Sequence, residues 1–222
     1  MDTIYRFERK FVIASPHYEY LINQIEIDGW RTLFPKRKIN NIYFDDILKY
    51  SYWQSVNGDL LKEKYRIRWY GQTFTSERII HSPVFEIKAK VNAMNYKILK
   101  SLEGIQLFEG MHYDNLKKQV FSQLSKHLSE NELIKVINKE IQFINNYDRE
   151  YFINDDGRVR LTIDKNQNYF TIEPVIKHFA TDESIVIELK YNSDKDYENF
   201  IIKTNLTQNS KYKNGINLLF GI

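Results

Sequence analysis

Apolar and polar residues alternate along much of this chain with a period of two, which is typical of β-strands that bury one face. This alternation predicts eight strands, over residues 4–13, 40–45, 63–70, 84–91, 147–153, 158–164, 169–172 and 185–191. Asp156-Gly157 is a turn signal between two of them, so residues 147–164 are expected to form one antiparallel hairpin. Most of the ordered chain is therefore predicted to be sheet.

Three segments show helical spacing of apolar residues instead. The first helix is expected to begin at Ser15-Pro16, where an N-cap residue precedes a proline at the first helical position. Its buried side chains are expected to be Tyr18, Leu21, Ile22 and Ile25. The second segment, residues 114–144, is interrupted by a capping box at 129–132 and so predicts a helical hairpin. A third helix is expected over residues 193–208.

Charged residues in four predicted strands fall on a single face, because residues two apart on a strand point to the same side. In residues 63–70, the cations Lys64, Arg66 and Arg68 share one face and apolar residues take the other. The same separation recurs at 84–91, 158–164 and 185–191. An open sheet with a solvated charged face would produce this alternation too, and for an arbitrary β-protein that interpretation is the more common one.

Two features favour an enclosed charged face. Lys64, Arg66 and Arg68 follow one another at intervals of about 7 Å, and their repulsion is costly without an anion. Aromatic residues would bury the opposite face, so closure of the sheet would gather Lys and Arg from several strands around one lumen. A triphosphate fits such a lumen, since Arg and Lys donate to phosphoryl oxygens and carboxylate-held Mg²⁺ or Mn²⁺ bridges neighbouring phosphates.

The composition narrows the function classes. Of the 222 residues, 42% are hydrophobic and 27% charged, which indicates one folded domain over residues 1–222 rather than a disordered chain. A formal net charge of +3 falls short of a strongly basic nucleic-acid binder. The absence of cysteine excludes disulfides, thiolate metal sites and a Cys nucleophile. A charged N-terminus and the lack of a long apolar run predict no signal peptide or membrane span, so a cytoplasmic location is expected.

The order of the motifs resembles the catalytic domain of the vacuolar transporter chaperone (VTC) polyphosphate polymerases, within the CYTH-like triphosphate tunnel metalloenzymes. The motifs that carry the resemblance from end to end are Arg6-Phe7-Glu8-Arg9-Lys10-Phe11, Ile42-Tyr43-Phe44-Asp45, Tyr65-Arg66-Ile67-Arg68-Trp69-Tyr70-Gly71, Phe85-Glu86-Ile87-Lys88, Tyr147-Asp148-Arg149, Val159-Arg160-Leu161-Thr162-Ile163-Asp164, Ile187-Glu188-Leu189-Lys190 and Ser210-Lys211-Tyr212. Each motif alone is weak evidence, but all eight in this order are specific.

The resemblance implies an α+β, mainly β fold: a closed antiparallel barrel, or triphosphate tunnel, with flanking helices. The residues that it implies as phosphate contacts are Lys10, Arg66, Arg68, Lys88, Arg149, Arg160 and Lys211. It implies Glu188 as the ligand of Mn²⁺ or Mg²⁺. Secondary candidates for the same lumen are Lys64, Lys190 and Lys213, each of which could instead be a solvated lysine.

The N-terminal motif departs from the broader superfamily, which opens with Glu-x-Glu-x-Lys. Arg6 stands here in place of the first glutamate, as it does in VTC-like members. The departure argues against a relative of the adenylate cyclase or thiamine triphosphatase type and removes one metal ligand. The regulatory domain and the membrane part of the eukaryotic polymerases are not found in this sequence, and a membrane partner encoded elsewhere is left open.

The resemblance implies an enzyme that transfers the γ-phosphoryl group of ATP to a growing inorganic polyphosphate chain. With an activated water, the same site would be a metal-dependent triphosphatase acting on ATP or inorganic triphosphate. A non-catalytic polyphosphate-binding module is the third interpretation. Nucleic acid is not an expected partner, because Tyr65, Ile67 and Trp69 face away from the charges, so base stacking and phosphate contact would not share a surface. The five histidines show no paired spacing and are assigned no role.

Overall fold

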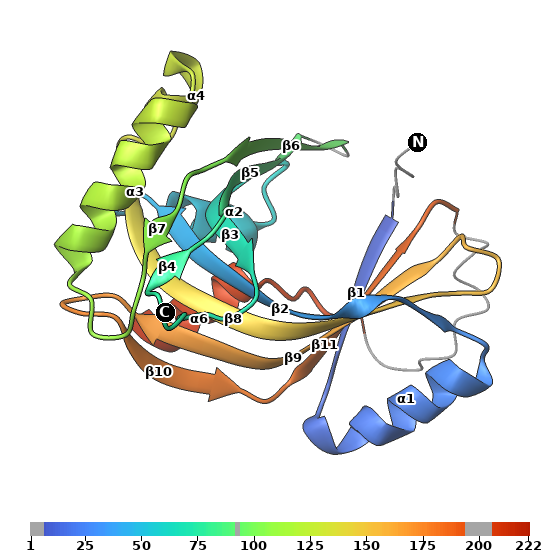
Figure 1. The fold of residues 1–222 in the computed structure, drawn as a ribbon. Helices are drawn as coiled ribbons and strands as arrows, with labels where there is room; N and C mark the ends of the chain where they lie inside the picture. Colours follow the sequence, from blue (N-terminus) through green and yellow to red (C-terminus); the bar gives the residue numbers. More distant parts are fainter. Residues whose placement is uncertain (1–6, 92–93, 194–205) are drawn as a thin grey trace. The chain divides into compact units, whose positions relative to one another are not determined.

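The computed structural model describes residues 7–91, 94–193 and 206–222 (Figure 1). The chain divides into two compact units. Unit 1 consists of residues 1–38, 147–167 and 181–210, and unit 2 consists of residues 39–146, 168–180 and 211–222. The single domain expected from the sequence stays a prediction.

Strands make up most of the described chain. They are β1 (Phe7–Ile13), β2 (Arg31–Asp45), β3 (Leu61–Tyr70), β4 (Ile79–Ile80), β5 (Val84–Val91), β6 (Met94–Ser101), β7 (Ile105–Gln106), β8 (Glu140–Ile153), β9 (Arg160–Thr171), β10 (Lys177–Asp182) and β11 (Ile185–Tyr191). The helices are η1 (Ser15–His17), α1 (Tyr18–Ile27), α2 (Tyr50–Asn57), α3 (Tyr113–His127), α4 (Glu130–Ile134) and α6 (Lys211–Phe220). The mainly β, α+β fold class is therefore confirmed.

Nine strands form one sheet in the order β1-β11-β9-β8-β2-β3-β5-β6, with β10 beside β9, while β4 and β7 form a separate pair. The order ends at β1 and β6, so pairing among the described residues does not close the barrel that was predicted. The outer edge of β1 is occupied in another way. Phe11 forms an isolated bridge with Leu206, and the Thr207 N–H donates to the Lys10 carbonyl at 2.9 Å. The C-terminal segment thus takes edge groups that strand closure would need.

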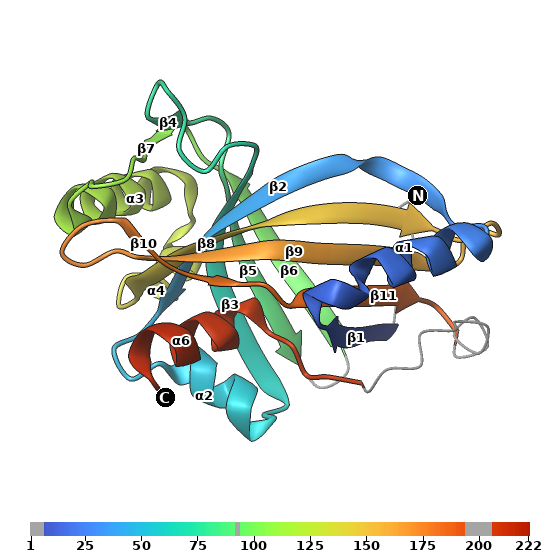
Figure 2. The same ribbon diagram turned by 90° about the horizontal axis from the view of Figure 1, so that it is seen from below.

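In unit 1, the apolar faces of β1, β9 and β11 pack against helix α1. The buried core residues of this unit are Phe11, Leu21, Ile25, Val159, Leu161, Ile163, Ile185, Ile187, Leu189 and Tyr191. Tyr18 and Ile22 are partly buried against this core, so the predicted apolar face of α1 is confirmed. Figure 2 shows α1 running alongside these strands. The alternate positions on the same strands carry the charged residues of the site.

In unit 2, β3 and β5 bury one face against helix α3. Tyr65, Ile67 and Phe85 are at most 3% exposed and share a cluster with Leu116 and Val120 of α3. The predicted separation of apolar and charged faces on β3 and β5 is therefore confirmed. A second cluster in this unit comprises Tyr43, Tyr52, Phe143, Tyr169, Tyr212 and Ile216. It joins α2 and α6, which lie side by side in Figure 2.

The predicted helical hairpin over 114–144 is wrong in its second half. Helix α3 and the capping box between Ser129 and Glu132 are present, but α4 ends at Ile134. Ile141 and Ile144 lie in β8. Residues 141–147 are all buried, so both faces of this strand are covered and the period-two signal disappears. A strand buried on both faces then looks like a helix in sequence.

Other boundaries also differ from those expected. One continuous strand, β9, replaces the two strands predicted at 158–164 and 169–172. The alternation fails between them because Asn166 has a positive φ of 55° within a polar run. The start of the first helix is a 3-10 turn, η1, and Ser15 is not its cap. The third predicted helix lies almost wholly outside the described residues, as does the start of the first predicted strand. Elements that were not predicted are α2, β4, β6, β7, β10 and α6.

Candidate functional site

The charged face of unit 1 is built from cross-strand neighbours on β1, β11 and β9. The register pairs Lys10 with Glu188 and Glu188 with Thr162, so these three residues form one row across the strands. The adjacent row on the same face consists of Glu8, Lys190 and Arg160. Directly opposed Cβ atoms in antiparallel strands lie about 5 Å apart, which brings side chains within one row into contact range.

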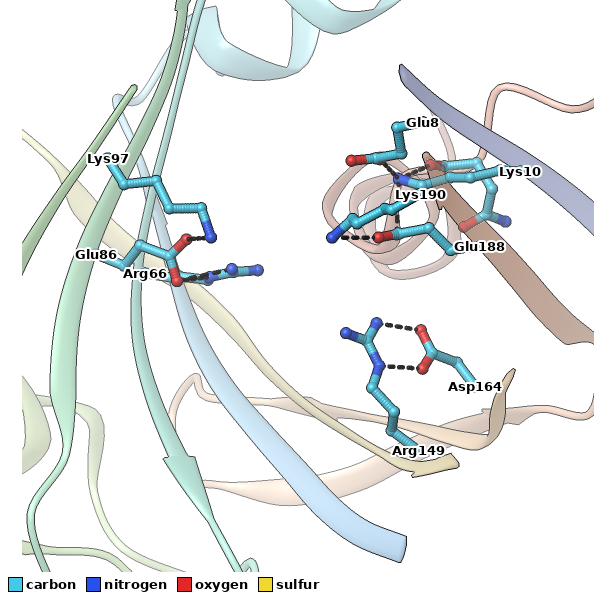
Figure 3. A network of polar contacts seen from close by, with 10 residues as sticks. Glu8, Lys10, Arg66, Glu86, Lys97, Arg149, Asp164, Glu188 and Lys190 are labelled. Carbon is cyan, nitrogen blue, oxygen red and sulfur yellow. Dashed lines mark hydrogen bonds and ion pairs between the residues drawn. The ribbon is translucent and has the colours of Figure 1, made fainter. Parts of the chain in front are cut away.

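Lys10 and Glu188 form the centre of this face (Figure 3). The Lys10 Nζ lies 2.9 Å from Oε1 of Glu8 and 3.6 Å from Oε2 of Glu188, while the Lys190 Nζ lies 2.7 Å from Oε1 of Glu188. Burial opposes the charge on Lys10, but Glu188 and Glu8 outweigh it and hold the pKa of Lys10 above its ordinary value. Burial likewise opposes the charge on Glu188, and Lys10, Lys190 and Arg149 together hold its pKa well below the usual range. Both groups are therefore ionised at neutral pH.

Arg149 and Asp164 form a second pair in unit 1. The Arg149 Nε donates to Oδ1 of Asp164 at 2.5 Å, and its Nη2 donates to Oδ2 at 2.7 Å (Figure 3). The Asp164 residue is 1% exposed. Burial works against the Arg149 charge, but Asp164 dominates and keeps the pKa of Arg149 raised. A fork-to-fork pair of this kind fixes the plane of the guanidinium.

In unit 2, Arg66 is paired with Glu86 across β3 and β5. Its Nε and Nη2 donate to Oε2 of Glu86 at 3.0 and 2.7 Å, and the Lys97 Nζ from β6 lies 3.2 Å from Oε1 (Figure 3). Burial raises the pKa of Glu86, but Arg66, Arg68 and Lys97 overcome it and lower that pKa to about 2. This pair corrects the repulsion argument made from β3 alone, because the neighbouring strand supplies an internal anion to Arg66.

Arg68 contacts a pair of hydrogen-bonded asparagine amides. Its Nε donates to Oδ1 of Asn41 at 2.9 Å, and Nδ2 of Asn41 donates to Oδ1 of Asn145 at 2.9 Å. Both asparagines are fully buried. The two buried amides fix the position of the Arg68 guanidinium.

A row of lysines crosses the same face of unit 2. The register places Lys64 opposite Lys88, and Lys88 opposite Lys97. Like charges that face each other directly across strands are destabilising. Three lysines therefore lie in one row on β3, β5 and β6, and Lys97 among them is paired with Glu86.

The last two predicted cations, Lys211 and Lys213, lie in the first turn of α6, where both are partly buried. The residue between them anchors the helix: the Tyr212 hydroxyl donates to Oδ2 of Asp45 at 2.5 Å. Oδ1 of Asp45 accepts from the backbone N–H of Ser51 at 3.0 Å. Asp45 thus connects the first turns of α2 and α6 and determines the position of Lys211.

The structure distributes the predicted site residues over both units. Unit 1 holds Lys10, Arg149, Arg160, Glu188 and Lys190, and unit 2 holds Lys64, Arg66, Arg68, Lys88, Lys211 and Lys213. Glu86, Asp164 and Asn41, which orient three of the arginines, were not predicted as site residues from the sequence. Lys97 was not predicted as a site residue either, because Tyr96, Ile98 and Leu99 interrupt the strand alternation around it. Lys88, by contrast, lies in a strand whose alternation is unbroken.

The donor set around Glu188 suits a hard divalent cation. Glu8 and Glu188 both contact the Lys10 ammonium, so two carboxylates approach one point, and carboxylate oxygens are ligands that Mg²⁺ and Mn²⁺ accept. Within residues 7–91, 94–193 and 206–222, no three His, Asp or Glu side chains gather as a metal cluster. The remaining ligands would have to be phosphate oxygens and water.

The family assignment follows from a comparison with protein-family models. The model of the VTC domain matches residues 5–220. The chain belongs to the VTC domain family. The resemblance drawn from the eight motifs is thereby confirmed over nearly the whole sequence. A comparison with the curated proteins gave no match.

Solved structures similar to this VTC domain include a proposed adenylate cyclase from Bacillus halodurans, with a TM-score of 0.53 and 15% identity over 93% of this chain and 95% of that one. A proposed adenylate cyclase from Vibrio parahaemolyticus gives a TM-score of 0.44 and 10% identity over 86% and 79% of the two chains. A protein from Pyrococcus horikoshii gives a TM-score of 0.46 and 10% identity over 93% of this chain and 97% of that one. The Bacillus halodurans likeness supports a shared fold and nothing about activity. In the part of the VTC domain that the structure describes, no helix has the length and apolarity to span a membrane.

Proposed function

We propose that this VTC domain is a polyphosphate polymerase, which transfers the γ-phosphoryl group of ATP to the end of an inorganic polyphosphate chain. The observation that carries the proposal is the family match over residues 5–220. The closed tunnel implied by the resemblance belongs to the same proposal. So do its phosphate contacts, Lys10, Arg66, Arg68, Lys88, Arg149, Arg160 and Lys211, and the secondary candidates Lys64, Lys190 and Lys213.

The charge arrangement within each unit supports a polyanionic substrate. The lysine row of Lys64, Lys88 and Lys97 in unit 2 has cations directly opposed across strands. Buried carboxylates and amides hold the neighbouring arginines in fixed orientations before any ligand arrives. Guanidinium groups fixed in this way lose little conformational freedom when they bind phosphate, which favours binding.

The chemistry needs little beyond positioning and charge neutralisation. A terminal oxygen of the acceptor phosphate forms a bond to the γ-phosphorus of ATP. The bond between that phosphorus and the β–γ bridging oxygen breaks, and ADP leaves with the electron pair. Because the acceptor oxygen is already anionic, no general base is required. Arg and Lys side chains would offset the charge that repels nucleophile from electrophile and would stabilise the charge on the departing ADP.

Glu188 would hold the divalent cation, with Glu8 beside it. When bound, Mn²⁺ or Mg²⁺ neutralises and orients phosphate oxygens. The part played by the protein is to keep Glu188 ionised. Lys10, Lys190 and Arg149 do this by holding its pKa well below the ordinary value. Replacement of Glu188 by Gln should remove metal-dependent turnover.

Product analysis tests the proposal. The purified protein is incubated with ATP and Mn²⁺, and the products are separated on a polyphosphate gel. We expect a ladder of phosphate chains from the wild type, and a fall in kcat/KM of about 100-fold or more in Arg66→Ala. The matched control is Arg158→Ala, which removes an exposed arginine paired with Asp156 and should leave the ladder unchanged.

Two results would contradict the polymerase assignment. Orthophosphate without chains would identify a triphosphatase that uses the same binding residues. Binding of polyphosphate without loss of ATP would identify a non-catalytic binding module.

A further inference from the structure

One hydroxyl on the charged face of unit 1 has no hydrogen-bond partner. Oγ1 of Thr162 exposes less than 1 Å² and makes no hydrogen bond among the described residues. A polar group that is withdrawn from water without a partner destabilises the fold. A buried, unsatisfied hydroxyl therefore needs an explanation beyond the fold itself.

The position of Thr162 is defined by the strand register. It lies on β9 between Arg160 and Asp164, and all three residues share one face because they are two apart. Leu161 and Ile163, on the other face, are fully buried in the apolar core. The Thr162 hydroxyl is thus part of the charged face and not of the core.

Across the strand pair, Thr162 faces Glu188 directly. The two oxygens of that carboxylate are used by other partners, Lys190 at 2.7 Å and Lys10 at 3.6 Å. Thr162 therefore ends a row that begins at Lys10 and passes through Glu188. Its hydroxyl belongs to the same face as Lys10, Lys190 and Glu188 and forms a hydrogen bond with none of them.

We propose that Thr162 is a substrate-binding residue whose hydroxyl donates a hydrogen bond to a phosphoryl oxygen of the bound triphosphate. This inference rests on the proposed function and adds to it a neutral donor among the charged ones. A phosphate that pairs with Lys10 and Lys190 takes over part of the contact these lysines make with Glu188. Its oxygens then lie against the end of the row, where the Thr162 hydroxyl is the available donor.

Substitution of Thr162 tests this proposal. Thr162→Val keeps the β-branched shape that suits a strand and removes only the hydroxyl. Since that hydroxyl has no partner in the protein, its removal should leave the melting temperature of the ligand-free protein unchanged or raise it. A residue with a structural hydrogen bond would behave in the opposite way.

The experiment is calorimetric titration of inorganic tripolyphosphate into the full chain, first in EDTA and then with Mn²⁺, with wild type, Thr162→Val and Thr162→Ser. The Kd of Thr162→Val should be about 10- to 100-fold weaker than that of the wild type, as expected for loss of a hydrogen bond to a charged group. Thr162→Ser retains the hydroxyl and should bind within about threefold of the wild type. Thermal unfolding of each ligand-free protein provides the control for folding.

The outcomes separate this inference from the function on which it rests. If the wild type binds tripolyphosphate and Thr162→Val binds equally well, the Thr162 assignment is wrong while the function stands. A loss of affinity that occurs only when Mn²⁺ is added would also overturn it, because the hydroxyl would then contact metal-bound water. A lower melting temperature of ligand-free Thr162→Val would show a structural role instead. If the wild type binds tripolyphosphate neither in EDTA nor with Mn²⁺, the proposed function and the inference both fail.

Discussion

At the scale of single residues, the charged faces are arrays of pre-paired groups. Asp164 holds Arg149, Glu86 holds Arg66, and Asn41 holds Arg68. Each of these partners is nearly or fully buried. The period-two alternation along each strand predicts which cations share a face. It does not predict which acid or amide lies opposite which arginine. That information depends on the register between strands that are distant in the chain.

Asp164→Asn tests the buried pair. The change leaves the Arg149 guanidinium in a buried site without its counter-charge, so the free energy of unfolding should fall by about 2–4 kcal/mol. Urea denaturation followed by circular dichroism measures it. The matched control is Asp156→Asn, at an exposed pair in which Nε and Nη2 of Arg158 both donate to Oδ2 of Asp156. It should have little effect, because exposed pairs are screened by water. Equal losses in the two variants would show that burial of the Arg149–Asp164 pair is irrelevant to its strength.

Glu86 predicts a pH dependence. Its folded-state pKa of about 2 lies below the ordinary value of 4.5. The ionised carboxylate therefore stabilises the fold fully above pH 4.5, and this contribution is lost as the pH falls from 4.5 towards 2. In Glu86→Gln the free energy of unfolding should be lower at pH 7 and should change less steeply between pH 5 and pH 3 than in the wild type. Identical slopes for the two proteins in urea titrations would refute the ion pair as the cause.

At the scale of elements, the predictability of each segment follows from which faces it buries. Strands β3, β5 and β11 have one apolar and one charged face, and their alternation placed them within two residues. Strand β8 buries both faces over 141–147 and was mistaken for a helix. Helix α2 was missed because its buried positions include Ser51 and Gln54, whose side chains carry no hydrophobic signal.

Tyr212→Phe tests how α6 is anchored. The variant removes the hydroxyl that donates to Asp45. Asp45 keeps its bonds from the backbone N–H groups of Ser51 and Tyr52, so the cost should be modest, about 1–2 kcal/mol. Amide hydrogen exchange in α6 should become faster while exchange in α3 is unchanged. Tyr20→Phe, at a tyrosine that is 68% exposed, is the control. Unchanged exchange in α6 would mean that the Asp45 contact does not hold the helix.

Gly215→Ala in α6 compares the stabilising effect of a higher helix propensity with the destabilising effect of a steric overlap. In an exposed helix, alanine is more favourable than glycine by about 1 kcal/mol. At Gly215, an added Cβ would overlap the ring of Phe143 in β8. We therefore expect a net destabilisation of about 1–3 kcal/mol by urea unfolding. Phe143→Leu should recover part of it when combined with Gly215→Ala. A Gly215→Ala protein at least as stable as the wild type would contradict this close packing.

At the scale of the whole molecule, the motif order predicted the family, and the family model confirms it over residues 5–220. The mainly β fold class also followed from the sequence. Barrel closure could not be predicted from the sequence, because it depends on which backbone groups pair with the edge of β1. Residues 206–207 form the backbone contacts at that edge. The alternation of apolar and polar residues does not determine which segment pairs with the edge of β1. The site residues identified from motif positions stay predictions until they are tested by substitution.

The polymerase assignment depends on where the γ-phosphoryl group of ATP goes. The most direct measurement is a mass balance with ATP radiolabelled in the γ-phosphate, in the presence of Mn²⁺. ADP, orthophosphate and gel-retained phosphate chains are quantified over time. A polymerase should release one ADP for each labelled phosphoryl group recovered in chains, with little orthophosphate. Release of ADP matched by orthophosphate, with no label in chains, would contradict the account.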